Sequence, residues 1–352
     1  MSSTPALTRW RTAGAGAAKT ALLRCGFFTA LRRLKPSRQV AILRYHAICG
    51  PEGYTYADPG ICVSPGAFAQ HAAYLAAHYD VLPLPEVVRT MRAGSTLPPN
   101  AVAITFDDGY TDNLEAARVL QRHGLTATFY LTAGCLGGET AFWPAELRAL
   151  VSAIPGPAFR IRAGGDELTL ANATAEQRHR AIRRLSRLFK SNPIRLREEV
   201  RVQLRRLAGD PAIPGAILSW ENVAEMSRLG MTIGAHTLTH PNLPSAGPED
   251  ARSEIAGSKS RLETKLGISV TMFSYPNGGA ERYVTPQVRQ LVQDAGYEAA
   301  TTSTNGFASR SSDLFGLERV QVAERLEDLV FALEVERFAF APKPRMEAAL
   351  LD

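Results

Sequence analysis

The 352-residue sequence has only four cysteines, and no two of them form a Cys-x-x-Cys pair. This scarcity argues against a zinc knuckle or a thioredoxin-like motif. Cys49 and Cys62 could bridge a loop in an oxidising compartment, although isolated thiols are the favoured interpretation. Collagen-like, coiled-coil and disordered compositions are also missing, and no internal repeat is present. The chain is therefore expected to form one α/β domain with an insertion, or two domains.

Acidic residues are absent from the first 45 positions, which hold nine Lys and Arg. The formal net charge of +6 is a property of this N-terminal arm, because the rest of the chain has 31 basic against 34 acidic residues. A nucleic-acid-binding protein would need a basic face on its folded domain, so no nucleic-acid partner is expected.

The arm also lacks a long uncharged hydrophobic run. Its apolar stretch, 13–31, is interrupted by Lys19 and Arg24, which suits neither a signal-peptide core nor a membrane-spanning helix. Two interpretations stay equal: an amphipathic helix that makes peripheral contact with an anionic membrane, and an ordinary helix packed on the domain. A membrane-peripheral or cytoplasmic location is expected in preference to secretion. The apolar residues that could share one helical face are Leu22, Leu23, Phe27, Phe28 and Leu31.

Short apolar runs alternate with helical patterns along most of the chain. This alternation predicts a parallel sheet, and about eight strands predict a barrel related to the (β/α)₈ type. The helical patterns lie at 65–79, 112–123, 220–229, 248–266 and 285–295. The strand-like runs lie at 40–45, 81–84, 101–106, 126–131, 231–235, 271–275, 298–302 and 319–323.

A stretch from about 144 to 215 breaks the alternation and is predicted to be a helical insertion. Its Arg-rich helical run is expected to be a solvated face, with contact to an anionic glycan or lipid as the less favoured alternative. The predicted organisation is therefore an arm at 1–38, a barrel at 39–340 and a tail at 341–352.

Two motifs directly after predicted strands are typical of a metal site. Asp107 and Asp108 follow the buried run AVAITF, so one carboxylate can bind a metal while the other accepts a proton. His236 and His240 follow the run MTIGA, and two imidazoles four residues apart can meet one cation. Asp108 and the two histidines would supply three ligands and leave positions open for water and substrate, as in catalytic sites.

Two further motifs end strands at the same predicted edge. In the run 273–279, FSYPNGG, a tight turn can aim a backbone N–H at the mouth of the barrel, where it could hold an oxyanion. His46 ends the first strand and could protonate a leaving amine. A structural role is favoured for the four histidines on predicted helices, His71, His78, His123 and His179.

These motifs, TFDDG, then HTLTH, then YPNG, resemble those of the polysaccharide deacetylase family (the NodB homology domain, carbohydrate esterase family 4). The resemblance covers roughly residues 40–140 and 215–325. The N-terminal YHAI is also similar to a circularly permuted subgroup that includes bacterial deacetylases of poly-N-acetylglucosamine exopolysaccharide. The resemblance implies a distorted (β/α) barrel, a divalent metal, usually Zn²⁺, and an acetylated polysaccharide or glycan substrate from which N-acetyl groups are removed.

Carried over by position, the resemblance implies that Asp107 is the general base and His46 the general acid. It implies that the backbone N–H of Asn277 helps to bind the oxyanion. The implied metal ligands are Asp108, His236 and His240.

The sequence departs from the family pattern in the third motif. Many members have an arginine there that orients the catalytic base, but this chain has Ser274, and Asn277 replaces the usual aromatic residue after the proline. Arg44 and Arg319, on strands that could border the site, are the candidates to replace that arginine.

Aromatic residues near the motifs could form a platform for a sugar, although core packing is at least as well favoured for each. Predicted substrate contacts are Tyr110, Trp143, Tyr275 and Pro276, with Trp220, Tyr54 and Tyr56 as further candidates. Two rival functions are considered. One is a non-catalytic glycan-binding or assembly protein on the same barrel, and the other is an Fe(II) oxygenase, which also uses two histidines and a carboxylate.

Overall fold

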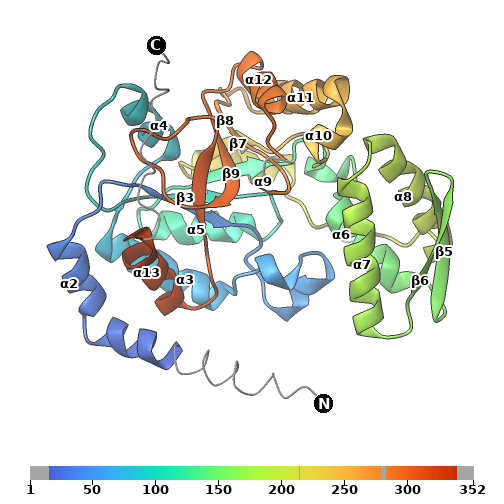
Figure 1. The fold of residues 1–352 in the computed structure, drawn as a ribbon, viewed down its shortest axis with the longest axis horizontal. Helices are drawn as coiled ribbons and strands as arrows, with labels where there is room; N and C mark the ends of the chain where they lie inside the picture. Colours follow the sequence, from blue (N-terminus) through green and yellow to red (C-terminus); the bar gives the residue numbers. More distant parts are fainter. Residues whose placement is uncertain (1–15, 214, 279–282, 339–352) are drawn as a thin grey trace, which may run out of the picture.

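The computed structural model describes residues 16–213, 215–278 and 283–338. Its centre is a ring of parallel strands in the order β1-β10-β9-β8-β7-β4-β3, closed by pairing of β3 with β1 (Figure 1). The short strand β2 pairs with the start of β3. The predicted barrel is therefore confirmed. Its strands are β1 (Ala41–Tyr45), β2 (Asp80–Val81), β3 (Ala101–Phe106), β4 (Thr128–Leu131), β7 (Thr232–Ala235), β8 (Met272–Ser274), β9 (Ala299–Asn305) and β10 (Leu317–Gln321).

Alternation along the strands decides which side chains enter the ring. Ile42 and Ala103 belong to a buried cluster that joins residues of strands around the ring, whereas their neighbours Leu43 and Ile104 pack in the larger cluster under the helices. Since side chains alternate along a strand, Asp107 continues the inward side that begins at Ala103. The strand period therefore aims this carboxylate into the mouth of the barrel.

Helices pack around the ring, and the helical patterns predicted from the sequence all form. One strand prediction is wrong at its end, because Leu84 begins a helix instead of closing a strand. Pro85 lies in the first turn of that helix, where its missing N–H costs nothing, whereas in a strand it would break the ladder. The helices are α3 (Pro65–His78), α4 (Leu84–Arg92), α5 (Asn113–Arg122), α9 (Trp220–Arg228), α10 (Leu243–Ala246), α11 (Pro248–Leu266), α12 (Pro286–Asp294) and α13 (Leu326–Glu334).

The predicted insertion forms a lobe at one side of the barrel, with a hydrophobic cluster of its own (Figure 1). It contains a hairpin that the sequence analysis missed. Gly164 and Gly165 form the turn of this hairpin with positive φ angles of 62° and 96°, a backbone that suits tight hairpin turns. The elements of the lobe are α6 (Trp143–Ala153), β5 (Ala158–Ala163), β6 (Asp166–Ala171), α7 (Ala175–Lys190) and α8 (Ile194–Ala208).

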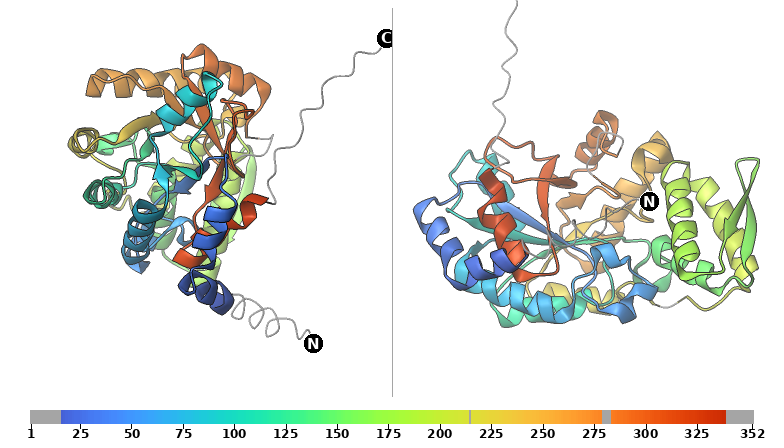
Figure 2. Two further views of the ribbon diagram at one scale, coloured as in Figure 1. Left: turned by 90° about the vertical axis from the view of Figure 1, so that its left-hand side faces the viewer. Right: turned by 60° about the horizontal axis from the view of Figure 1, so that its bottom comes forward.

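The arm does not form the continuous amphipathic helix that its pattern suggested. Gly26, in a left-handed conformation with φ 78°, separates helical residues 16–24 from α2 (Phe27–Leu34). Phe28 is fully buried against Phe331 of α13, and the two helices lie side by side in both views of Figure 2. Arg32 pairs with buried Glu334 at 3.0 Å. The arm therefore packs on the domain as an ordinary helix would, and the membrane contact gains no support. Residues 1–15 and the tail predicted at 341–352 lie outside the described ranges.

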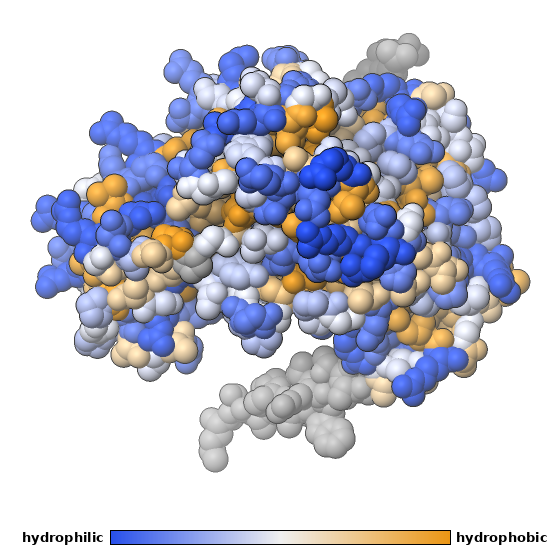
Figure 3. All heavy atoms as spheres, turned by 180° about the vertical axis from the view of Figure 1, so that it is seen from behind, coloured by the Kyte–Doolittle hydropathy of each residue, from blue (hydrophilic) through white to orange (hydrophobic). Residues whose placement is uncertain are grey.

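The surface of the domain has few exposed hydrophobic side chains that lie together. On the face opposite that of Figure 1, hydrophobic residues lie singly or in small groups among hydrophilic ones (Figure 3). Within the described residues, no helix is both long enough and apolar enough to cross a bilayer. Phe27 and Leu34 on α2 are among the large hydrophobic side chains that remain exposed.

Candidate active site

The motifs at the strand ends meet in one pocket of about 520 Å³. The β1, β3 and β8 strands each end just before a predicted site residue, and β7 leads into the loop that carries two more. Because all of these strands run parallel, their carboxyl ends open on the same edge of the barrel. The predicted residues that line the pocket are His46, Asp107, Asp108, His236, His240 and Asn277.

The loops that carry the site residues contain several non-glycine residues with positive φ angles. Of the described non-glycine residues, six have a positive φ angle. Such conformations are costly and persist only where the surrounding structure imposes them, often at functional sites. Four of the six lie in the site motifs: Asp108, Thr237, His240 and Asn277.

Asp108, His236 and His240 form a compact set of candidate metal ligands. Asp108 Oδ1 lies 3.4 Å from His236 Nε2 and 3.3 Å from His240 Nε2, and the three side chains are buried. Asp108 Oδ1 is a buried acceptor without a hydrogen-bond partner in the described part of the chain. Two imidazoles and one carboxylate whose oxygen lacks a hydrogen-bond partner are a donor set that fits a divalent metal.

The His236 ring is oriented by the third motif. Its Nδ1 lies 2.7 Å from the carbonyl oxygen of Ser274. Since a carbonyl only accepts, Nδ1 carries the proton, and Nε2 is the ring atom that faces Asp108. In the neutral ring, Nε2 presents a lone pair. Both Nε2 and the carboxylate are then acceptors, so a bound cation would satisfy them together.

Asp107 makes a two-point ion pair with Arg319 of β10. The guanidinium donates to Oδ1 at 2.8 Å and to Oδ2 at 2.6 Å, and Arg319 is fully buried. Arg319 also donates to the Ser274 hydroxyl at 3.2 Å. Arg319, one of the two candidates from the sequence, therefore contacts both the carboxylate and the residue that stands where many family members have arginine. The other candidate, Arg44, donates instead to Gln321.

Electrostatics keep both carboxylates ionised. Burial alone raises the pKa of Asp107, but the Arg319 guanidinium, with contributions from His236 and His46, outweighs it, so the pKa lies below its ordinary value. Burial likewise raises the pKa of Asp108, and the adjacent His236 and His240 hold it well below the ordinary value. Two anionic oxygen donors therefore face the pocket side by side.

His46 lies near the Asp107 oxygen, Oδ2, that also accepts a hydrogen bond from Arg319. Its Nε2 is 3.7 Å from Asp107 Oδ2, and its backbone carbonyl accepts a hydrogen bond from Asn113 at 2.8 Å. Burial lowers the pKa of His46 to about 4, although the two aspartates oppose this shift. The imidazole is therefore neutral near pH 7 in this site.

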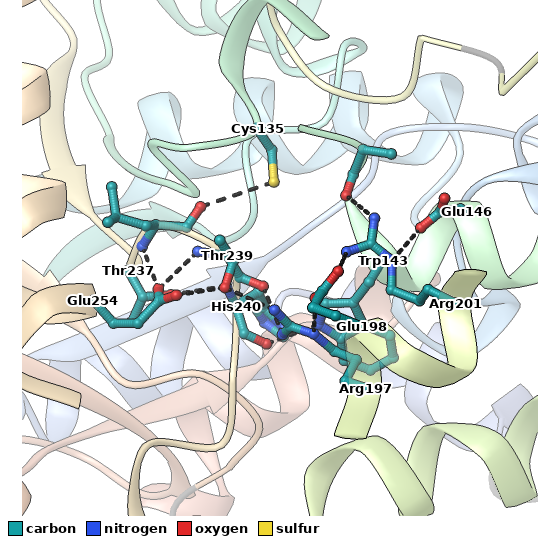
Figure 4. Close-up of polar contacts among 12 residues, drawn as sticks. Cys135, Trp143, Glu146, Arg197, Glu198, Arg201, Thr237, Thr239, His240 and Glu254 are labelled. Atoms are coloured by element: carbon teal, nitrogen blue, oxygen red, sulfur yellow. Dashed lines mark hydrogen bonds and ion pairs between the residues drawn. The ribbon is translucent and has the colours of Figure 1, made fainter. Parts of the chain in front are cut away.

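The loop that carries both histidines is held from three helices (Figure 4). Glu254 of α11 accepts the backbone N–H groups of Leu238 and Thr239, each at 2.8 Å. Arg197 of α8 donates to the carbonyl and hydroxyl of Thr239 at 3.1 and 2.9 Å. The indole of Trp143 in α6 donates to the His240 carbonyl at 2.9 Å. Two of these three helices, α6 and α8, belong to the insertion. The lobe therefore supports the loop that carries His236 and His240, called the histidine loop below.

The residues predicted to contact the substrate differ in whether they line the pocket. Tyr110, Trp143 and Tyr275 line the pocket but are at most 3% exposed, because each also packs in a hydrophobic cluster or bonds to backbone. Pro276 is buried and is not among the lining residues. Tyr56, from the loop after β1, does line the pocket.

The residues of the site lie partly within a match to a known protein family. The model of the family described as polysaccharide deacetylase matches residues 94–155 and 174–300. The gap between the two matched parts corresponds to the β5–β6 hairpin of the lobe. His46, directly after β1, and Arg319, on β10, lie outside the match, and these two strands pair with each other.

Individual proteins agree with this match. The chain is 30% identical over 119 residues to the Bacillus subtilis (strain 168) protein named "Putative polysaccharide deacetylase YxkH", and that alignment spans 34% of this chain and 41% of the relative. The deacetylase PplD of Streptococcus pyogenes superposes with a TM-score of 0.57 at 21% identity, over 85% of this chain and 99% of the other. IcaB from Ammonifex degensii gives 0.54 at 18% identity, over 85% and 98%. These two structures share the fold.

Proposed function

The chain belongs to the polysaccharide deacetylase family, and we propose that it is a metal-dependent hydrolase that removes N-acetyl groups from an acetylated polysaccharide or glycan. The observation that carries the proposal is the pairing of a three-residue ligand set with a separate, arginine-bound carboxylate in one pocket. Each of the two adjacent aspartates then has a role of its own.

Asp108, His236 and His240 would hold a divalent metal, for which zinc suits the two imidazoles. Such an ion lowers the pKa of a bound water and polarises a carbonyl. The chain supplies orientation through the Ser274 carbonyl, which fixes the His236 ring, and through the Trp143 contact beside His240. These supporting hydrogen bonds keep the ligand atoms aimed at one point.

Asp107 would accept the proton of the attacking water. Arg319 keeps it ionised and fixes the carboxylate plane through two hydrogen bonds. The Oδ2 atom, which accepts from Arg319, is also the oxygen that lies 3.7 Å from His46 Nε2. A carboxylate held in this manner is preorganised to act as a base, because its orientation is fixed before the reaction.

His46 would return a proton to the departing amine as the C–N bond breaks. Since burial lowers its pKa to about 4, the resting imidazole must gain a proton before it can donate one. Asp107 Oδ2 is 3.7 Å from His46 Nε2, a short path for the proton taken from water. The proton would thus move from water to Asp107, to His46 and to the amine.

Asn277 is proposed to bind the oxyanion through its backbone N–H. Its side chain donates to the carbonyl of Pro241 at 3.0 Å, which anchors the left-handed turn beside the histidine loop. A fixed donor at this point would stabilise the charge that develops on the acetyl oxygen.

The rival functions are less well supported. Loss of the third-motif arginine would favour a non-catalytic glycan-binding protein, but in this site Arg319 pairs with Asp107 in its place. An Fe(II) oxygenase would use a similar ligand set, but such sites normally lie on all-β frameworks, and this barrel alternates strands and helices.

The test is acetate release from N-acetylglucosamine oligomers by chelator-treated protein, before and after zinc is added back. We expect release that depends on zinc. Equal release with and without metal would contradict the proposed role of the ion.

A further inference from the structure

The insertion helix α7 forms one wall of the candidate active site. Ala181, Leu185 and Phe189 face the hydrophobic cluster of the lobe, four residues apart. The neighbouring face of the helix turns toward the pocket and is strongly basic. The α7 residues that line the pocket are Ile182, Arg183, Ser186, Arg187 and Lys190.

The three cations of this wall share one face of the helix. Arg183, Arg187 and Lys190 are spaced by four and three residues, so their side chains are neighbours. The described residues offer no ion pair to any of them, whereas Arg180 on the same helix pairs with Glu176. The Arg183 and Arg187 side chains also border a second hollow against β6.

The acidic groups of the pocket already have partners. Asp58 pairs with Arg148, and Asp107 pairs with Arg319. Asp108 belongs to the metal-ligand set. After these pairings, no described carboxylate makes an ion pair with the three cations of the α7 wall, and only the more distant charges of Asp58 and Asp108 act on Lys190.

We propose that Arg183, Arg187 and Lys190 bind a phosphate group of the substrate, so that the acetylated sugar is recognised as a phosphate ester. This inference rests on the proposed deacetylase function and names its substrate class. Guanidinium groups match the oxygen geometry of phosphate, and an ammonium adds a point charge. A phosphate monoester carries about −1.5 to −2 charges near neutral pH, which suits three cations better than a single carboxylate does.

The first experiment measures binding and needs no turnover. The chelator-treated protein is titrated by calorimetry with N-acetylglucosamine 1-phosphate and with N-acetylglucosamine, so that no metal can hold the phosphate. Wild-type protein should bind the phosphorylated sugar more tightly, and the R183Q/R187Q double variant should lose about tenfold or more of that affinity. R184Q is the matched control, because it removes the same charge from the same helix outside the pocket lining.

A second arm identifies the source of the phosphate. Nucleotide-diphosphate-linked and polyprenyl-diphosphate-linked N-acetylglucosamine are compared on the same variants, and tighter binding of one of them assigns the soluble or the lipid-linked ester. Equal affinity of wild type and double variant for the phosphorylated sugar would overturn the inference, as would a preference for an N-acetylated uronate. Either result leaves the proposed function standing, because acetate release from neutral oligomers tests that separately.

Discussion

Arg319 and Asp107 form a fully buried, two-point ion pair at the centre of the site, across 212 positions of sequence. Because β10 pairs with β1, and β1 with β3, closure of the ring brings the guanidinium to the carboxylate. Arg319 and Ser274 would together take the role that the family resemblance gives to an arginine in the third motif. The proposed base, Asp107, is therefore held from the last strand of the barrel.

Replacing Arg319 should separate positioning from metal binding. In the R319K variant the charge remains but the two-point contact is lost, so kcat/KM should fall on the order of 100-fold. Arg319 lowers the pKa of Asp107, so the acidic limb of the rate profile should move to higher pH in R319M. Metal content should stay that of wild type. A profile with an unmoved acidic limb would contradict the positioning role.

His46 should be required for turnover and dispensable for metal. The H46Q variant keeps hydrogen-bonding capacity but cannot carry the proton to the amine, so kcat should fall by about 100-fold or more. Zinc content measured on the same preparation should be unchanged. H123Q, an exposed histidine at the end of α5, serves as the control. A wild-type rate for H46Q would remove His46 from the acid role.

The contacts on the histidine loop predict an effect of the insertion on metal affinity. In R197M the hydrogen bonds to Thr239 are lost, so the loop should hold His236 and His240 less firmly and the zinc Kd should rise by about 10- to 100-fold. Competition with a chromophoric chelator measures this. R195M on the same helix, with an 89% exposed side chain, is the matched control. Equal zinc affinity in both variants would contradict the support role.

His71 should contribute to the acid sensitivity of the fold. Burial lowers its pKa from 6.5 to about 4, with Glu324 opposing, and its Nδ1 lies 3.2 Å from the Tyr45 hydroxyl. Above pH 6.5 the imidazole is neutral in both states. Between pH 6.5 and 4 the His71 imidazole binds a proton in the unfolded chain but not in the folded chain. The free energy of unfolding therefore falls as pH falls, by up to about 3 kcal/mol.

Urea unfolding at pH 7.0 and 4.5 checks this sign. The free energy of unfolding should drop less between the two pH values in H71Q than in wild type. An equal drop in both proteins would show that the His71 proton plays no part in acid unfolding.

The sequence predicted the barrel and the ends of β1, β3 and β7 well, because buried runs such as AVAITF and their following polar residues are local patterns. It also predicted that Asp108, His236 and His240 would share one edge, since parallel strands end together. It could not choose between Arg44 and Arg319, because that choice depends on ring closure. Glu254 carried no local signal, since its partners are backbone groups of a loop 15 residues away.

The insertion shows a second limit of local patterns. Its Arg-rich helix was expected to be a solvated face, and the side of α7 that faces the pocket depends on how the lobe packs on the barrel. The hairpin was missed although Phe159, Ile161 and Ala163 alternate with polar residues, because the Pro and Gly at 155–157 and 164–165 that flank this short run are typical of loops.

The most direct test of the central claim is one comparison of D107N with D108N. Zinc content and acetate release from N-acetylglucosamine oligomers are measured on the same samples. D107N should keep zinc and lose turnover, whereas D108N should lose both, because only Asp108 lies among the proposed metal ligands. Equal zinc loss in the two variants, or acetate release by D107N at the wild-type rate, would contradict the division of roles between the two aspartates.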